Sequence, residues 1–268
     1  MVIKTRNIWK QSPGNVFFRC KSGYVICSDA IDMLDSLHNE SADIIFLDPP
    51  FNLGKQYGRK RGVSDKLSDE EYFKFITKVL DRSCNILKEG ASLFLYHIPK
   101  WGFRFADYLD SKLNFQHWIA VSMKNGFVRG PRLYPAHYAL LHFSKGKPSK
   151  LKRPKIKIQS CRHCGKDVKD YGGYRKYLTQ GINLSDIWDD TSPVRHKHTK
   201  HRRPNELPPI ILNRIMMICG RKNGLLVDPF AGSGTAPVTA KAFGMNFIAC
   251  DREKEYCNLM MKRLKAVS

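Results

Sequence analysis

The residue types best suited to chemistry in this sequence stand together at Asp48-Pro49-Pro50-Phe51, directly after the apolar run Ile44–Leu47. The apolar run predicts a buried strand, and the two prolines cannot extend it because they lack a backbone N–H donor. They fix a stiff, extended turn, called the acidic turn below, that holds a carboxylate beside an aromatic ring. Such a turn could grip a planar ring that carries an amino group. An ordinary turn at a strand end would look the same, so these residues alone leave both interpretations open.

A second stretch, residues 228–235, reads Asp-Pro-Phe-Ala-Gly-Ser-Gly-Thr and is called the glycine turn below. It lies between an expected strand and an expected helix, where glycines let a ligand approach the backbone and the helix start offers unpaired N–H groups. Asp251 ends the next expected strand about 20 residues after Gly232, a spacing that suits the two hydroxyls of a ribose. The pattern excludes a phosphate-binding loop and a nucleophile elbow. A dinucleotide site stays open, although Val238 stands where its third glycine would be.

The charge of the chain favours a polyanionic partner. The 268 residues include 46 Lys and Arg against 24 Asp and Glu, for a formal net charge of +22. This excess is spread from Lys4 to Lys265, so it is not a disordered basic tail, and nucleic acid is the favoured partner. General solubility or an anionic membrane surface would be the alternatives, but no amphipathic lipid-binding helix is evident.

The sequence predicts a cytoplasmic protein with no membrane partner. Residues 1–6 lack the apolar segment of a signal peptide, and no apolar run is long enough to span a bilayer. Most of the eight cysteines sit inside apolar strand or helix patterns, which favours reduced thiols. We expect a prokaryotic cytoplasm or, for a viral protein, association with the nucleoid.

Expected strands and helices alternate along most of the chain. The strands are expected at 24–27, 43–47, 92–96, 117–123, 138–143, 225–227 and 246–250. This alternation predicts an α/β protein with a doubly wound, mostly parallel sheet. Residues 1–22 are expected to be a poorly defined lead-in. Helices are expected from the capping box at Ser68 to Gly90, over 103–113 and over 205–219.

The acidic turn and the glycine turn together strongly resemble the two signature motifs of the amino-methyltransferases of DNA. The acidic turn comes first, an order that resembles the β group of this family, a circular permutation of the common methyltransferase sheet. The resemblance implies a seven-stranded Rossmann-like sheet and S-adenosylmethionine as the methyl donor. It also implies a catalytic domain made of residues 1–143 and 184–268, with a target-recognition region inserted at 144–183.

The resemblance assigns roles to individual residues. The implied catalytic residues are Asp48, Pro49, Pro50 and Phe51. The implied cofactor-binding residues are Asp29, Ala30, Asp48, Arg203, Asn205, Glu206, Asp228, Phe230, Gly232, Gly234, Thr235 and Asp251. Of these, Asp251 would hold the ribose and Asp29 would lie beside the adenine ring of the cofactor. The chain departs from the family pattern at Ser28, where a glycine is usual, and at 200–204, which replace His-Pro-Thr-Gln-Lys-Pro.

The expected reaction is direct methyl transfer to an exocyclic amine. The adenine amine is a poor nucleophile because its lone pair is delocalised into the ring. Asp48 and a carbonyl of the acidic turn could accept both amine hydrogens and aim a pyramidal nitrogen at the methyl group. Phe51 would stack on a base extruded from the duplex.

Adenine N6 is preferred over cytosine N4 because N4 enzymes of the family tend to carry Ser at the position of Asp48. A cytosine C5 enzyme is excluded, because the chain lacks its Pro-Cys pair. A non-catalytic nucleic-acid-binding protein on the same scaffold, and a methyltransferase acting on RNA or protein, remain alternatives.

Contacts with double-stranded DNA are expected from basic and aromatic residues outside the two turns. The candidates are Asn52, Lys55, Arg59, Lys60, Arg129, Arg132, Lys145, Lys147, Tyr174 and Arg175. The last four belong to the expected insertion, whose Lys, Arg and Tyr content suits backbone contacts and stacking, although a solvated basic loop would have the same composition. A restriction endonuclease and a second copy of the chain are further candidate partners.

Cys161-Arg162-His163-Cys164 resembles half of a zinc knuckle. His196, His198 and His201 could complete a metal site, but the basic run that contains them could equally meet phosphate. No second C-x-x-C occurs, so no metal ligands are assigned; zinc stays an alternative to two free surface thiols. His97 and His142, at strand ends, are expected to be structural.

Overall fold

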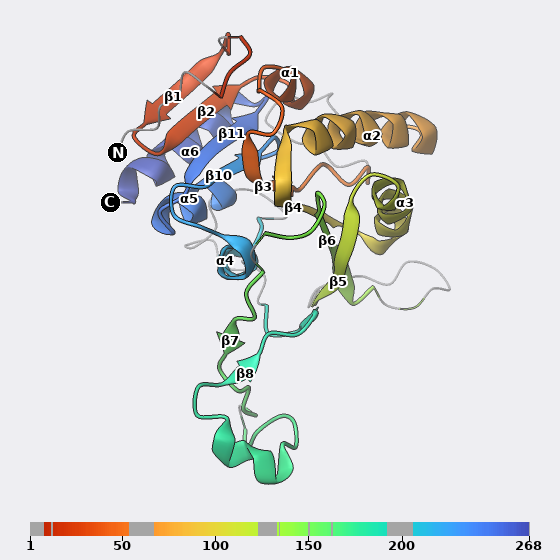
Figure 1. The fold of residues 1–268 in the computed structure, drawn as a ribbon, viewed down its shortest axis with the longest axis vertical. Helices are drawn as coiled ribbons and strands as arrows, with labels where there is room; N and C mark the ends of the chain where they lie inside the picture. The colour runs from red at the N-terminus through yellow and green to blue at the C-terminus, as the bar shows by residue number, and fades with distance from the viewer. Residues whose placement is uncertain are drawn as a thin grey trace.

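The computed structural model describes residues 8–11, 13–53, 67–122, 133, 135–149, 151–161, 163–191 and 206–267. Within these residues, six α-helices surround one large sheet (Figure 1). The helices are α1 (Ala30–Asp35), α2 (Asp69–Ile86), α3 (Pro99–Asp110), α4 (Pro209–Cys219), α5 (Thr235–Ala242) and α6 (Lys254–Ala266). None of the described helices is both long and apolar enough to cross a membrane.

Nine of the described strands form this sheet, in the order β1-β2-β11-β10-β3-β4-β6-β5-β9. They are β1 (Val16–Cys20), β2 (Gly23–Cys27), β3 (Ala42–Leu47), β4 (Leu87–His97), β5 (Asn114–Ser122), β6 (His137–Ser144), β9 (Ile187–Trp188), β10 (Leu225–Asp228) and β11 (Asn246–Asp251). Strands β2, β11, β10, β3 and β4 run parallel to one another. Strands β1 and β6 are antiparallel to their neighbours.

The sheet is doubly wound, with one core on each face. Helices α1, α2 and α3 pack on one face through residues such as Leu34, Ile76 and Phe105. Helices α4, α5 and α6 pack on the other face through residues such as Ile211 and Met260. Successive side chains of a strand point to opposite faces, so β3, which is buried along its whole length, contributes to both cores.

The predicted fold class is confirmed, and all seven predicted strands are present. Two further strands extend the sheet: β1, inside the stretch expected to be a poorly defined lead-in, and the two-residue strand β9. The predicted helix boundaries need correction. Helix α2 ends at Ile86 and continues directly into β4, so it does not reach Gly90. Helix α3 begins at Pro99, earlier than expected, and α4 begins at Pro209, because prolines favour the first helical turn.

Residues 153–183, called the arm below, extend away from the sheet (Figure 1). The arm contains the two-stranded ribbon β7 (Lys155–Ile156) and β8 (Ile182–Asn183), and a 3-10 helix over Gly172–Tyr177. None of its described residues is buried. The arm therefore has no apolar core of its own.

Candidate active site

The acidic turn leaves the carboxyl end of β3, in the middle of the sheet. Strand β3 is buried on both faces, and Pro49 is buried directly after it, while Asp48 is half-buried. The prolines stop the strand at Leu47 because they cannot continue its hydrogen-bond ladder. The carboxylate of Asp48 is thus held at the rim of the core rather than in solvent.

The glycine turn leaves the carboxyl end of β10, the neighbour of β3. Asp228 ends this strand with only 2% of its surface exposed, and its Oδ1 accepts the Phe230 N–H at 3.0 Å. Gly232 and Gly234 have φ angles of 51° and 83°, in the left-handed region that favours glycine. Helix α5 then begins at Thr235, with its first N–H groups at the same edge of the sheet.

Two contacts fix the conformation of the glycine turn. A Cβ atom on Gly234 would lie 2.3 Å from Cγ of Met260, so packing against α6 also requires glycine here. The Gly232 N–H donates to Oδ2 of Asp251 at 3.0 Å, and the Glu253 N–H donates to Oδ1 of the same carboxylate at 2.8 Å. Asp251 therefore closes the turn from the end of β11, the strand beside β10.

The two turns, about 180 residues apart in the sequence, line one pocket at the switch point of the sheet. Its lining is Phe46, Asp48, Leu207, Asp228, Phe230, Ala231, Ser233, Thr235 and Ala236. The hollow between the two turns is partly open, and its roughly 280 Å³ of empty space includes open solvent. Asp48 and Asp228 thus face one space, as adjacent parallel strands require.

Aromatic side chains enclose the acidic turn, and the sequence predicted only one of them. Phe51 is 5% exposed, with its ring centroid 4.7 Å from that of His97 and 5.8 Å from that of Tyr138. Burial raises the pKa of Tyr138, and the charge of Asp48 raises it further. Burial likewise raises the pKa of Tyr96, and the charges of Tyr138 and Asp48 raise it further. Both phenols therefore lie within range of the charge of Asp48, and no local pattern around them signals this.

A half-buried arginine, also absent from the prediction, braces the glycine turn from α6. Arg263 donates to the Ser233 carbonyl at 2.7 Å and to Oγ of Ser233 at 3.1 Å. Its guanidinium also lies 3.6 Å from the carboxylate of Glu206, which is 9% exposed. Burial lowers the pKa of Arg263, and the charge of Glu206 opposes that shift. Glu206, a predicted cofactor ligand, is thus linked to the glycine turn through Arg263.

Asp29 and Ala30 stand at the same edge of the sheet as Asp251, because β2 pairs in parallel with β11. Asp29 caps α1 by accepting the Ile31 N–H at 2.8 Å, and its side chain is exposed. Ala30 is buried in the first turn of that helix. The predicted adenine-side residues therefore lie two strands from the pocket centre.

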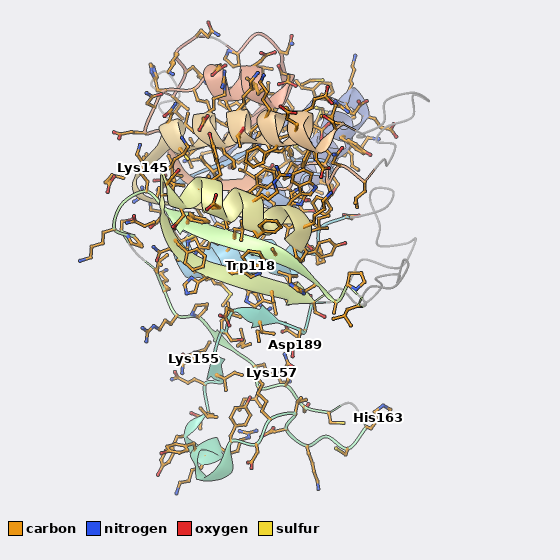
Figure 2. The ribbon with its side chains drawn as sticks, turned by 90° about the vertical axis from the view of Figure 1, so that its right-hand side faces the viewer. Trp118, Lys145, Lys155, Lys157, His163 and Asp189 are labelled. Carbon is orange, nitrogen blue, oxygen red and sulfur yellow. The ribbon has the colours of Figure 1, made fainter. Side chains whose placement is uncertain are left out.

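The predicted DNA-contacting residues are not gathered in one place. Both polar atoms of the Asn52 amide pair with the Leu67 backbone: Nδ2 donates at 2.9 Å and Oδ1 accepts at 2.8 Å. Lys145 donates to the carbonyl of Leu87, the first residue of β4, at the end of the sheet opposite the pocket, where exposed Lys147 also lies. Figure 2 shows Lys145 far from the outer part of the arm, where His163 projects.

The remaining described candidates are on the arm. Tyr174 is 77% exposed in the 3-10 helix, while the neighbouring Arg175 forms an ion pair with Asp167. Lys155 and Lys157 lie on the narrow part of the arm, between the sheet and the tip (Figure 2). The predicted residues Lys55, Arg59, Lys60, Arg129, Arg132, Arg203 and Asn205, and the histidines 196, 198 and 201, lie outside the described residues.

Cys161 and Cys164 form a tight turn on the arm, in which the Gly165 N–H donates to the Cys161 carbonyl at 2.9 Å. Hydrogen bonds from the backbones of Cys164 and His163 lower the pKa of the Cys161 thiol. No group of three metal-ligating side chains occurs among the residues that the structure describes. Zinc binding at this pair stays a prediction.

A doubly wound sheet, an acidic turn and a glycine turn that share a pocket define a methyltransferase-like site, and comparison with known proteins agrees. The N6_N4_Mtase family, described as DNA methylase, matches residues 42–262. The chain therefore belongs to this family. Type II methyltransferase M.BamHI of Bacillus amyloliquefaciens is 41% identical over 251 residues, which is 93% of this chain and 58% of that protein. The chain thus spans little more than half the length of this relative.

Two solved structures share the fold. The PvuII DNA methyltransferase, described as cytosine-N4-specific, superposes with a TM-score of 0.64 at 16% identity, covering 95% of this chain and 89% of that one. M1.HpyAVI, determined as a complex with SAM, superposes with a TM-score of 0.61 at 18% identity, covering 90% and 98%. At these identities the likeness establishes the fold alone.

Proposed function

We propose that this chain transfers a methyl group from S-adenosylmethionine to an exocyclic amine of a base in double-stranded DNA. The observation that carries the proposal is the single pocket between the acidic turn and the glycine turn. Methyl transfer needs donor and acceptor in line within one enclosed space, and adjacent parallel strands supply that arrangement. Membership of the DNA methylase family and the M.BamHI likeness support it.

The pocket residues fit S-adenosylmethionine in their chemistry. Asp48 and Asp228 offer negative charge, which suits a ligand with an ammonium group and a sulfonium centre. The left-handed Gly232 brings backbone close to the pocket, and the Asp251 carboxylate is oriented by the N–H groups of Gly232 and Glu253 before it meets a ribose. When bound, S-adenosylmethionine supplies an electrophilic methyl group on a positively charged sulfur.

The residues of the chain prepare the amine. The Asp48 carboxylate accepts one amine hydrogen, and a backbone carbonyl of the acidic turn accepts the other. The Pro50 carbonyl already accepts the Tyr72 hydroxyl, so the Pro49 carbonyl is the better candidate. The nitrogen lone pair then points away from both acceptors and toward the donor. As the N–C bond would form, the bond between the methyl group and the sulfonium sulfur would break and leave a neutral thioether. The amine would release one proton, for which the Asp48 carboxylate is the acceptor within hydrogen-bond reach.

The aromatic enclosure holds the base outside the duplex. A base amine cannot be reached inside stacked DNA, so the base must be extruded. Phe51 is almost covered by His97, Tyr96 and Tyr138, and Tyr138 is the more exposed of the two phenols beside Asp48. We assign base stacking to Phe51 and Tyr138 together.

The arm and the net charge of +22 support DNA as the substrate. Residues 144–183 carry twelve Lys and Arg against two Asp, and exposed tyrosines stand between them. This composition suits phosphate contacts and stacking, and it predicts an affinity that falls steeply with salt. We propose that this insertion reads the target, within the domain division given above. A restriction endonuclease partner, a homodimer and a cytoplasmic location stay predictions.

Between the two amines we propose adenine N6, because the acidic turn begins with Asp rather than Ser. Cytosine N4 is the alternative. The hydrogen-bond argument serves both amines equally, since each offers two N–H donors beside a ring nitrogen.

The experiment that tests the proposal incubates the chain with methyl-labelled S-adenosylmethionine and duplex DNA, and analyses the nucleosides by mass. N6-methyl-2′-deoxyadenosine from the DNA is the expected product. N4-methylcytosine would confirm amino-group transfer and overturn the choice of base. Label on RNA or on protein, with none on DNA, would contradict the proposed substrate class.

A further inference from the structure

Next to the acidic turn, a buried series of hydrogen bonds connects two residues that do not line the pocket. Tyr72 on α2 is 2% exposed, and His97 at the end of β4 is fully buried. The Tyr72 hydroxyl bonds to the Pro50 carbonyl, and it lies 2.7 Å from Nε2 of His97. A phenol, an imidazole and a backbone carbonyl are thus linked in one line that ends at the turn.

The donor and the acceptor of each hydrogen bond in this series follow from the groups at its two ends. The Ile98 N–H donates to Nδ1 of His97 at 2.8 Å, so Nδ1 carries no proton. The neutral ring must then carry its proton on Nε2 and donate it to the Tyr72 oxygen. The Pro50 carbonyl can only accept, so the Tyr72 hydroxyl donates to it.

Burial keeps this arrangement in a single protonation state. It lowers the pKa of His97 to about 3, so the ring is neutral near pH 7. The same ring packs on Phe51, with centroids 4.7 Å apart, and Tyr72 packs on Trp101 at 4.7 Å. One face of the His97 ring thus packs against Phe51 of the acidic turn. Its Nε2 donates to the Tyr72 hydroxyl, which in turn donates to the Pro50 carbonyl.

We propose that Tyr72 and His97 are positioning residues that set the geometry of the acidic turn for methyl transfer. The Pro50 peptide joins the Pro49 carbonyl to the Phe51 ring, so fixing it fixes both groups that face the target base. This inference rests on the proposed function. It assigns a catalytic consequence to two side chains that do not line the pocket.

The first test replaces Tyr72 by Phe, which removes the hydroxyl and keeps the ring. With saturating S-adenosylmethionine and duplex DNA, we expect the single-turnover rate to fall about 10- to 100-fold, because small misplacements of reacting groups have effects of that size. The dissociation constant for S-adenosylmethionine should stay within about threefold, since the glycine turn is untouched. Tyr108→Phe is the matched control: its hydroxyl donates to Asp81 at 2.8 Å, away from the turn, and its loss should leave the rate unchanged.

His97 provides the second test and keeps the inference falsifiable if Tyr72→Phe does not fold. His97→Gln keeps an N–H donor of similar reach toward Tyr72, whereas His97→Leu removes it. The Gln variant should retain a rate at least about tenfold above that of the Leu variant, at similar affinity for S-adenosylmethionine. Equal rates in the two variants, or a folded Tyr72→Phe protein within about threefold of the unchanged rate, would overturn the inference.

A readout without substrate separates this inference from the proposed function. In the ligand-free protein, nitrogen NMR should show His97 protonated at Nε2 only, and Tyr72→Phe should shift that signal. A His97 ring protonated at Nδ1 would overturn the positioning role even if methyl transfer is observed. If the unchanged protein methylates no DNA but shows the Nε2 tautomer, the proposed function fails and the hydrogen-bond chain stands.

Discussion

The pocket end of the sheet and the arm are built in opposite ways. Around the pocket, Asp228, Ser233 and Thr235 are each less than 5% exposed, although all three are polar. On the arm, no described residue is buried, and Tyr174 and Tyr177 are more than 70% exposed. The pocket is therefore ordered by the protein itself, whereas the arm lacks the apolar contacts that would hold a fixed shape.

This difference matches two different tasks. Methyl transfer needs reacting atoms placed to a fraction of an ångström, which only a packed core and satisfied hydrogen bonds provide. Binding a long polyanion needs positive charge and accessible stacking surfaces, and the binding itself can supply order. Substitutions that are harmful at the pocket should therefore be tolerated on the arm, and DNA binding should respond to the arm.

The largest difference should appear when the same substitution is made at two glycines. Gly234→Ala meets both a left-handed backbone and Cγ of Met260 at 2.3 Å, so we expect a loss of about 2–5 kcal/mol in unfolding free energy. Gly173→Ala on the arm meets no atom within 4 Å and should change it by less than about 0.5 kcal/mol. Urea unfolding measures both. A Gly234→Ala protein as stable as the Gly173→Ala protein would show that the turn is not packed as described.

Acid should weaken the sheet region through its buried histidines. Burial lowers the pKa of His97 and of His142 to about 3, and for His142 the neighbouring His117 adds to the effect. Between about pH 6.5 and 3 these histidines are protonated in the unfolded chain but neutral in the folded protein. The free energy of unfolding therefore falls as the pH falls. We expect a loss of about 1 kcal/mol per histidine between pH 7 and 5.5.

Urea unfolding at pH 8, 7 and 5.5 checks this pH dependence. His142→Gln should remove part of the loss between pH 7 and 5.5 and leave the difference between pH 8 and 7 unchanged. A variant with the same loss as the unchanged protein would show that His142 does not stay neutral in the folded state.

Substitutions on the arm should change the affinity for DNA without changing the free energy of unfolding. Replacing Tyr174 and Tyr177 by Ala should weaken duplex binding about tenfold, because stacking on a base contributes on the order of 1–3 kcal/mol. Unfolding free energy should change by less than about 0.5 kcal/mol, since both rings are exposed. Phe115→Ala is the control, an exposed aromatic at the start of β5, at the sheet end opposite the pocket. Equal DNA affinities in the two variants would remove the arm from the DNA interface.

The sequence predicted what local motifs encode and missed what only the folded chain assembles. The acidic turn and the glycine turn carry their own prolines and glycines, so their conformations and their neighbouring strands could be predicted. Tyr138, Arg263 and Tyr72 reach the site from distant elements, and nothing adjacent to them in the sequence marks them. No Gly or Pro directly follows Ile86, so the sequence does not mark the end of α2. The helix ends there because the next residues pair with β3 as strand β4.

We infer that Asp48 acts on the acceptor amine across a pocket whose far wall binds the methyl donor. Asp48→Ala, compared with Asp110→Ala at an exposed position on α3, tests it in single-turnover methyl transfer to duplex DNA, alongside S-adenosylmethionine binding. We expect a rate lowered by at least about 100-fold for Asp48→Ala, with the dissociation constant for S-adenosylmethionine within about fivefold and no change for Asp110→Ala. An Asp48→Ala protein that methylates DNA at nearly the unchanged rate would contradict it.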